Sequence, residues 1–368
     1  MQLLKNILTS LLPISLTRDK EVTTMKNSEF ITLKSELLSV TTNEPKNLKE
    51  DELQIIIKIK KETTAFNRNN LTRTEAYLQY YHDHPEIHWS FLAHMVSRNG
   101  GWNMTDLKGS LIQPFLPKNK TKIFFEFLEK ANALIFQDAY PQLLLYHFSK
   151  KYNKNYFHLL SYFNVSTFMV PIWNYFWKTQ NSPLLTVALI INEQNYIQSR
   201  IMTEEKYKEE VLQTILFQAQ ERLGFTDVLF PIHGKKIKLA GVTVQEFNNV
   251  FNRIETGKKL YGILFHKIYN GAHTFANRTP HTGSRLDIWP DVFTANRGGK
   301  ELIYSPYLRD VWPDFAHTFI HGNDWFQSDD MITQLKTYYI PRRYMLTKDY
   351  QNDLHYLKVL KTVKEVVT

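Results

Sequence analysis

Side chains capable of acid–base or metal chemistry are concentrated in the segment HPEIHWSFLAHMVSRNGGWNMTD, residues 84–106. On a helical wheel of about 100° per residue, His84, His88 and Asn99 fall in the middle of an apolar arc, with Arg98 towards one margin. Burying such groups without partners costs about 1 to 3 kcal/mol each. We therefore expect them to meet other polar groups, a ligand or a metal inside the fold.

The helix predicted over Thr121–Ala139 offers a second set of candidates. Its apolar arc contains Asp138, while Asn132 lies towards the margin and Glu129 at the edge. A carboxyl group that faces a core needs a cationic or hydrogen-bonding partner, because an isolated buried carboxylate takes up a proton instead. Asp138 is therefore the stronger acidic candidate and Glu129 the weaker one.

A third set follows the stretch PLLTVALII, which is apolar all round, as expected of a central buried helix. The chain continues with Asn192, Glu193 and Asn195. These residues either line a pocket or mark the point where the helix emerges into solvent. Tyr196 and Ile197 come next and favour the pocket.

The loop TPHTGSRLDIWPD, residues 279–291, places His281 and Arg285 around a glycine. Loops that present several different polar groups are common in binding sites. They are also common as capping and turn motifs, so both interpretations stay open. Trp102 could stack on a flat ligand, although aromatic residues at such positions more often belong to the core.

Two histidines have a spacing compatible with metal binding. His84 and His88 are four residues apart on one predicted helical face and could share a divalent metal, with Asp138, Glu193 or His281 as the third ligand. The zinc signature HExxH is absent, and the lack of cysteine excludes zinc thiolates and iron–sulfur clusters. The favoured alternative is that both histidines form hydrogen bonds within the core or to a ligand. We predict no cofactor, with a divalent metal as the minority interpretation.

No motif of a familiar enzyme class is complete, because GxSxG, GxxxxGK[ST] and GxGxxG are all absent. His88, Asp138 and Glu193 suit general acid–base chemistry and are our catalytic candidates. The same groups could equally fix a ligand, so the sequence does not decide whether the protein is an enzyme. The ligand-binding candidates are His84, Arg98, Asn99, Trp102, Asn132, Asn192, Asn195, His281 and Arg285.

These side chains must be positioned by helices, because helical periodicity dominates and alternating strand patterns are scarce. With 43% hydrophobic residues among 368, we predict a mainly α protein, with a single large helical domain and irregular N- and C-terminal extensions. We place an amphipathic and flexible segment at 1–47, the helical domain with the polar pocket at 48–310, and a C-terminal extension at 311–368. Further helical patterns cover Thr72–His82, Ser166–Thr179, Pro183–Arg200, Glu204–Leu223 and Val244–Tyr269.

Two local breaks are expected in these helices. The pair Gly100-Gly101 should end the helix that begins near His84, with Pro85 in its first turn. Pro141 should interrupt the helix that begins at Thr121.

The formal net charge of +9 is spread along the chain, and its densest cluster is the short loop HGKKIK, residues 233–238. A dedicated phosphate-binding face usually shows more clustered lysine and arginine. The longest apolar run, residues 184–191, is far shorter than the roughly 20 residues that span a bilayer. We expect no transmembrane segment and a cytoplasmic location, with the N-terminal leucine pattern docked on the body of the protein or lying on a membrane surface.

Several long segments also resemble a known family. The run LTRTEAYLQYYHDHPEIHWSFLAHMVSRNGGWNMTDLKG, followed by ANALIFQDAYPQLLLY, VPIWNYFW, ALIINEQNYI and PHTGSR, is similar to the YppC-like family of bacilli, grouped as a domain of unknown function (number 2515). The resemblance covers roughly residues 60–290 and implies a bacterial, intracellular origin. It assigns no activity and no catalytic residues.

Our leading hypothesis is an intracellular helical protein that binds a small polar or anionic ligand in one pocket lined by these residues, with hydrolysis of that ligand left open. The alternative is a binding module for nucleic acid or a protein partner that uses its basic surface without catalysis. A structural protein with an inert polar core is the third possibility.

Overall fold

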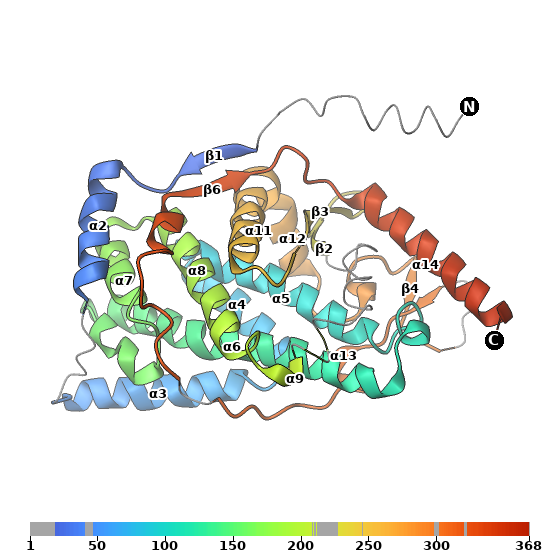
Figure 1. The fold of residues 1–368 in the computed structure, drawn as a ribbon, viewed down its shortest axis with the longest axis horizontal. Coiled ribbons are helices and arrows are strands. Elements are labelled where there is room, and N and C mark those ends of the chain that lie inside the picture. The colour runs from blue at the N-terminus through green and yellow to red at the C-terminus, as the bar shows by residue number, and fades with distance from the viewer. Residues whose placement is uncertain are drawn as a thin grey trace.

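The computed structural model describes residues 19–40, 47–207, 209, 211, 227–244, 246–297, 302–319 and 322–367, and it confirms a mainly α protein. Helices make up the body, and the strands are few and short (Figure 1). The helices are α2 (Asn27–Ser39), α3 (Glu50–Phe66), α4 (Asn70–Asp83), α5 (His88–Asp106), α6 (Lys118–Tyr152), α7 (Met169–Thr179), α8 (Ser182–Arg200), α9 (Glu205–Tyr207), α11 (Val250–Ile263), α12 (Tyr269–Arg278), α13 (Leu308–Val311) and α14 (Thr347–Val367). A π-helical turn, Leu264–Ile268, joins α11 to α12.

The strands form three two-stranded sheets within the described part of the chain. Two of the sheets are antiparallel and the third is parallel. The basic loop HGKKIK lies at the turn of the β2–β3 hairpin, which the sequence pattern did not predict. The pairs are β1 (Lys20–Thr23) with β6 (Thr337–Ile340), β2 (Asp227–Ile232) with β3 (Lys238–Thr243), and β4 (Phe293–Thr294) with β5 (Ile303–Tyr304).

Helix α8 occupies the centre of the core, as its all-round apolar sequence predicted. Every side chain from Leu184 to Ile191 is buried, and the helix packs against α5, α6, α7 and α11. The helix does not emerge into solvent at Asn192, because that side chain is also buried. The first polar residues of the NEQN segment therefore point into the protein.

The expected ends of helix α5 were wrong at both sides. His84 is the C-terminal cap of α4 and its backbone is no longer helical (φ −138°, ψ 66°), because proline disfavours helical backbone in the residue that precedes it. Helix α5 begins at His88 and continues through Gly100 and Gly101 to Asp106. Both glycines lie at close packing contacts, so they serve tertiary structure rather than helix termination.

The expected interruption at Pro141 was also wrong. Helix α6 runs unbroken from Lys118 to Tyr152 with Pro141 inside it. A proline inside a helix removes one hydrogen bond and costs about 3 kcal/mol. Tyr140 and Leu143, on either side of the proline, are buried in the same core, and this packing holds the helix together.

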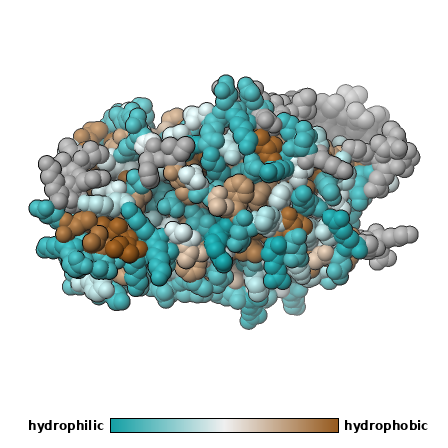
Figure 2. All heavy atoms as spheres, turned by 90° about the horizontal axis from the view of Figure 1, so that it is seen from below, coloured by the Kyte–Doolittle hydropathy of each residue, from teal (hydrophilic) through white to brown (hydrophobic). Residues whose placement is uncertain are grey.

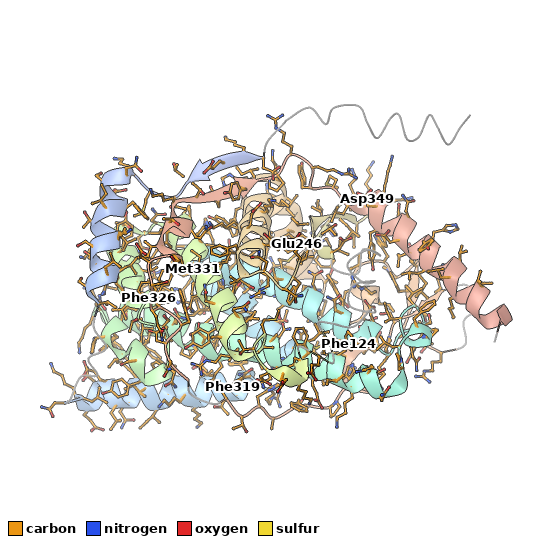
Figure 3. The ribbon with its side chains drawn as sticks, in the orientation of Figure 1. Phe124, Glu246, Phe319, Phe326, Met331 and Asp349 are labelled. Atoms are coloured by element: carbon orange, nitrogen blue, oxygen red, sulfur yellow. The ribbon has the colours of Figure 1, made fainter. Side chains whose placement is uncertain are left out.

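Both extensions contain regular structure, which we had not expected. In the N-terminal one, α2 buries Phe30, Leu33 and Leu37, and β1 pairs with β6 of the C-terminal one. Figure 3 shows Phe319, Phe326 and Met331 along the C-terminal segment, which crosses the helical body before reaching β6. The predicted N-terminal leucine pattern lies outside the described residues, as does most of the helix predicted over Glu204–Leu223.

The face seen from below is mostly hydrophilic, and its hydrophobic side chains gather towards the end of the molecule where α3 begins (Figure 2). Leu53 and Ile57 of α3 are among the exposed large apolar side chains. None of the described helices is long and apolar enough to cross a membrane.

Candidate functional site

A cavity of about 170 Å³ lies where α5, α6, α8 and α11 meet, next to β2. Its walls are mainly apolar, with side chains such as Leu92, Val96, Ile135 and Leu260. Polar groups reach it from four helices. The polar lining consists of Ser97 of α5, Asn132 of α6, Glu193 and Gln194 of α8, and Arg253 and Thr256 of α11.

Close helix packing shapes this cavity. Gly257 of α11 lines it and faces Ile190 of α8, where an added Cβ atom would lie 2.7 Å from Cγ2 of the isoleucine. Asn132, another lining residue, lies against Gly100 of α5 and donates a hydrogen bond to the Leu128 carbonyl (2.8 Å). The two glycines let two pairs of helices, α8 with α11 and α5 with α6, approach closely around the cavity.

Glu193 is the acidic group of the cavity. The residue is partly buried and lines the cavity. Burial raises its pKa to about 8, against the opposing effect of hydrogen bonds from Gln194 and Trp89. Within the described residues no lysine or arginine forms an ion pair with it, so the carboxyl group is predominantly neutral at pH 7.

Arg253 is the cationic group of the cavity, and it donates four hydrogen bonds to neutral acceptors. Its Nε donates to Gln194 Oε1 (3.0 Å), and its two Nη atoms donate to carbonyl and amide oxygens of Gln194, Phe247 and Gln198. The Gln194 amide in turn donates to Glu193 Oε1 (3.2 Å). The cation and the acid are thus connected through one glutamine rather than paired directly.

Asp138 occupies a separate, closed polar cluster. Its Oδ2 accepts hydrogen bonds from Asn192 (2.5 Å) and Gln142 (2.8 Å), and its Oδ1 is buried without a partner. Trp325 donates to the other end of Asn192, and Trp173 to the other end of Gln142. Burial raises the pKa of Asp138 to about 8, so this carboxyl group also holds a proton at neutral pH.

The two histidines of the proposed metal pair have different partners. His84 Nε2 is 3.0 Å from His147 Nδ1 of α6, beside Glu86. His88 Nδ1 is 3.0 Å from the hydroxyl of Tyr261, and its ring stacks on Phe265. The described residues contain no group of three or more His, Asp or Glu side chains able to hold a metal ion.

Burial also lowers the pKa of His88 to about 4, so this imidazole stays neutral at physiological pH. The side chain is partly buried and does not line the cavity.

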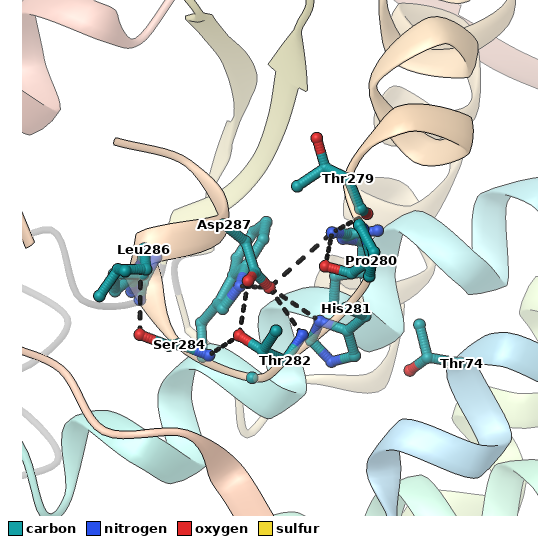
Figure 4. A network of polar contacts seen from close by, with 12 residues as sticks. Thr74, Thr279, Pro280, His281, Thr282, Ser284, Leu286 and Asp287 are labelled. Carbon is teal, nitrogen blue, oxygen red and sulfur yellow. Dashed lines mark hydrogen bonds and ion pairs between the residues drawn. The ribbon is translucent and has the colours of Figure 1, made fainter. Parts of the chain in front are cut away.

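Arg98, Trp102 and His281 belong to a buried network centred on Asp287 (Figure 4). The carboxylate accepts hydrogen bonds from the backbone and side chain of Thr282 and from Trp102 Nε1, at 2.5 to 3.2 Å. His281 lies between Asp287 (Nδ1, 3.4 Å) and Asn70 (Nε2, 2.8 Å), and Arg98 donates to the carbonyls of Thr279 and Pro280.

The charges in this network offset one another. Burial alone would raise the pKa of Asp287, but the hydrogen bond and charge of His281 and the charge of Arg98 hold it below its ordinary value. Burial lowers the pKa of Arg98 to about 10. With both ring nitrogens of His281 engaged and the Arg98 donors on backbone carbonyls, the network fixes the loop of residues 279–287 to α5.

Three further ligand-binding candidates also make structural contacts. Asn99 donates to the Leu229 carbonyl (2.9 Å) and accepts from the Leu229 N–H (2.8 Å), which fastens β2 to α5. Asn195 donates to the Ile191 carbonyl of its own helix. Arg285 forms an ion pair with Asp106 at 2.8 Å.

The structure therefore does not bring the predicted residues into one pocket. Of them, only Asn132 and Glu193 line the cavity. Arg253 and Gln194 of the polar wall were missed, because neither stands out from the helical pattern around it. Glu129, the weaker acidic candidate, is buried in an ion pair with Arg73 at 2.5 Å.

Comparisons with known proteins agree with the resemblance seen in the sequence. The family described as "Protein of unknown function (DUF2515)" matches residues 65–353, further towards the C-terminus than we expected. The chain is 40% identical over 315 residues to "Uncharacterized protein YppC" of Bacillus subtilis (strain 168), covering 85% of this chain and 96% of that protein. No solved structure matches the chain. The chain belongs to the family of proteins of unknown function DUF2515.

Proposed function

We propose that this protein binds a small, mainly apolar amine in the cavity at Glu193. The observation that carries the proposal is a carboxyl group in a mainly apolar cavity that pairs with no lysine or arginine in the described part of the chain. A buried carboxylate is costly unless a cation or several hydrogen bonds compensate it. An ammonium group on the ligand would supply the missing cation.

The volume sets the size of the ligand. An engineered cavity of about 150 Å³ lined by apolar side chains binds benzene. The cavity of about 170 Å³ is similar in size and has an apolar lining as well. We therefore infer a ligand of about one ring or a short branched chain, carrying one amine.

The walls suit a cation better than an anion. Tyr77, Trp89 and Phe247 line the cavity, and aromatic faces attract ammonium groups. Arg253 could in principle attract an anion, but most of its donors already bind protein oxygens. The polar or anionic ligand that the sequence suggested is for this reason not the one we propose.

The proposal is one of binding. Among the residues that line the cavity, Glu193, Arg253 and Tyr77 are the titratable ones, and no nucleophile and base are paired there. Hydrolysis of a ligand would depend on Glu193, whose carboxyl group is predominantly protonated at pH 7 and must ionise before it can act as a general base. A cytoplasmic location also belongs to this proposal, and cell fractionation would test it.

Three probes of similar size test the binding: benzylamine, toluene and benzoate. Isothermal titration calorimetry should give the tightest binding for benzylamine, weaker binding for toluene, and none for benzoate. Glu193→Gln keeps the shape of the side chain but cannot ionise, so it should reduce the preference for benzylamine over toluene by at least tenfold. The matched control Glu75→Gln, at an exposed position of α4, should leave all three affinities unchanged.

Two results would overturn the proposal. One is that none of the three probes binds. The other is that Glu193→Gln retains the wild-type preference for benzylamine, which would place the amine elsewhere.

A further inference from the structure

A second concave site lies at the π-helical turn between α11 and α12. The groove encloses about 680 Å³ and runs between this turn, the ends of β2 and β3 at Ile232 and Lys238, and the segment Tyr344–Met345. It shares no lining residue with the Glu193 cavity. The described residues of the groove thus form a distinct site, large enough for a ligand of nucleotide size.

The groove is basic. Lys238 and Lys267 line it, and none of its described lining residues is Asp or Glu. Both lysines are exposed. Burial lowers the pKa of His266, another lining residue, and the positive charges of Lys20 and Lys267 lower it further. The charge near His266 is therefore predominantly positive, which favours an anionic ligand.

Aromatic rings lie beside these cations. Phe265, Tyr269 and Tyr344 line the groove and are partly exposed, and the Lys267 ammonium lies 5.8 Å from the centre of the Tyr344 ring. Lysines that neutralise phosphates and aromatic faces that stack on bases are the two components of sites for single-stranded nucleic acid. A site for a simple inorganic anion would not need the rings.

We propose that this groove binds nucleotides, with phosphate at Lys238 and Lys267 and the base against Tyr344. The nucleotides could belong to a single strand of nucleic acid or be free in solution, and the chemistry of recognition is the same. The β2–β3 hairpin adds Lys235 and Lys236 at its exposed turn, which extends the positive surface along a strand. The proposal does not depend on the function proposed for the Glu193 cavity.

The test is fluorescence anisotropy with a fluorescein-labelled ten-residue oligothymidylate at about 50 and 200 mM salt, with unlabelled AMP and ATP as competitors. We expect binding that weakens with salt, because each neutralised phosphate of a single strand contributes a slope of about −0.7 in log K against log salt. Lys238→Ala/Lys267→Ala should weaken binding at least tenfold and flatten the salt dependence. Tyr344→Leu should weaken binding without changing the salt dependence.

Lys60→Ala/Lys61→Ala is the matched control, because it removes the same charge from exposed positions of α3, across the molecule from the hairpin (Figure 1). It should change the affinity less than twofold. Competition by AMP or ATP at low concentration would assign the site to free nucleotides, and failure to compete would assign it to the strand. No binding of the oligonucleotide, AMP or ATP, or equal losses in the two double variants, would overturn the proposal.

Discussion

Gly101 of α5 lies directly against the imidazole of His281. A Cβ atom built on Gly101 would be 2.5 Å from Nε2 of His281, the atom that bonds to Asn70. The helix can pass this close to the buried network only because residue 101 has no side chain. Gly101 therefore couples the path of α5 to the position of the loop that carries His281.

Replacing Gly101 with alanine should destabilise the protein. The added methyl group must displace His281 or Asn70, and overpacking of this kind typically costs about 1 to 3 kcal/mol in the free energy of unfolding. Urea denaturation followed by circular dichroism would measure the loss. Gly234→Ala is the control, because a Cβ atom there would meet its nearest neighbour at 3.5 Å, an ordinary contact. Equal effects of the two substitutions would contradict the packing argument.

Asn99 and Asn195 provide a second comparison. Both were candidate ligand-binding residues, but Asn99 binds the backbone of another element and Asn195 binds a carbonyl of its own helix. Asn99→Ala would leave the buried N–H and C=O of Leu229 without their side-chain partner, at about 1 to 3 kcal/mol for each group. Asn195→Ala removes one bond to a carbonyl of its own helix and should cost less. Urea unfolding of both variants would rank them. A larger loss of unfolding free energy for Asn195→Ala would show that the two hydrogen bonds between Asn99 and Leu229 of β2 are not important for stability.

The helical wheel predicted the burial of Asn99 and Asp138 correctly, whereas His88, which was placed in the same kind of apolar arc, is only partly buried. It could not predict their partners, because those depend on how distant segments pack. Asn99, for example, binds the backbone of Leu229, which is 130 residues away in the chain. We expected the candidate site residues to form one pocket. Because their partners come from different distant segments, they are divided among several clusters.

Local rules also failed where tertiary packing outweighed them. Gly100-Gly101 and Pro141 are ordinary helix breakers in sequence, yet both lie inside helices that the core holds in place. Glu193 was recognised because it follows an apolar helix directly. Arg253 was not, since a single arginine in an amphipathic helix resembles a solvent-exposed residue.

The pH dependence of stability should report the protonated state of Asp138. Its folded pKa of about 8 lies above the unfolded value near 3.8, so the folded state binds the proton more tightly. The resulting stabilisation is fully present below about pH 4, falls by up to about 1.4 kcal/mol per pH unit between the two pKa values, and is lost above pH 8. Glu193 should contribute in the same direction, because its pKa is also raised to about 8.

Asp138→Asn removes this titration while keeping an oxygen for Asn192 and Gln142. We expect the variant to be more stable than the wild type at pH 8, to lose that advantage towards pH 5, and to show a shallower pH dependence by about one proton. Urea denaturation from pH 5 to 9 measures this. Parallel stability curves for the two proteins would mean that Asp138 is ionised in the fold.

A substitution that fills the cavity should distinguish the contribution of its empty volume to ligand binding from the contribution of the Glu193 charge. Ala93 of α5 lines the cavity, and Ala93→Leu adds three carbon atoms on a good helix former. If the new side chain occupies the empty space, stability should stay constant or rise by up to about 2 kcal/mol, from about 0.8 kcal/mol per buried methylene. Calorimetry should show that this variant binds neither benzylamine nor toluene, whereas Glu193→Gln should still bind toluene. Retention of benzylamine binding by Ala93→Leu would place the ligand outside this cavity even if Glu193 affects its affinity.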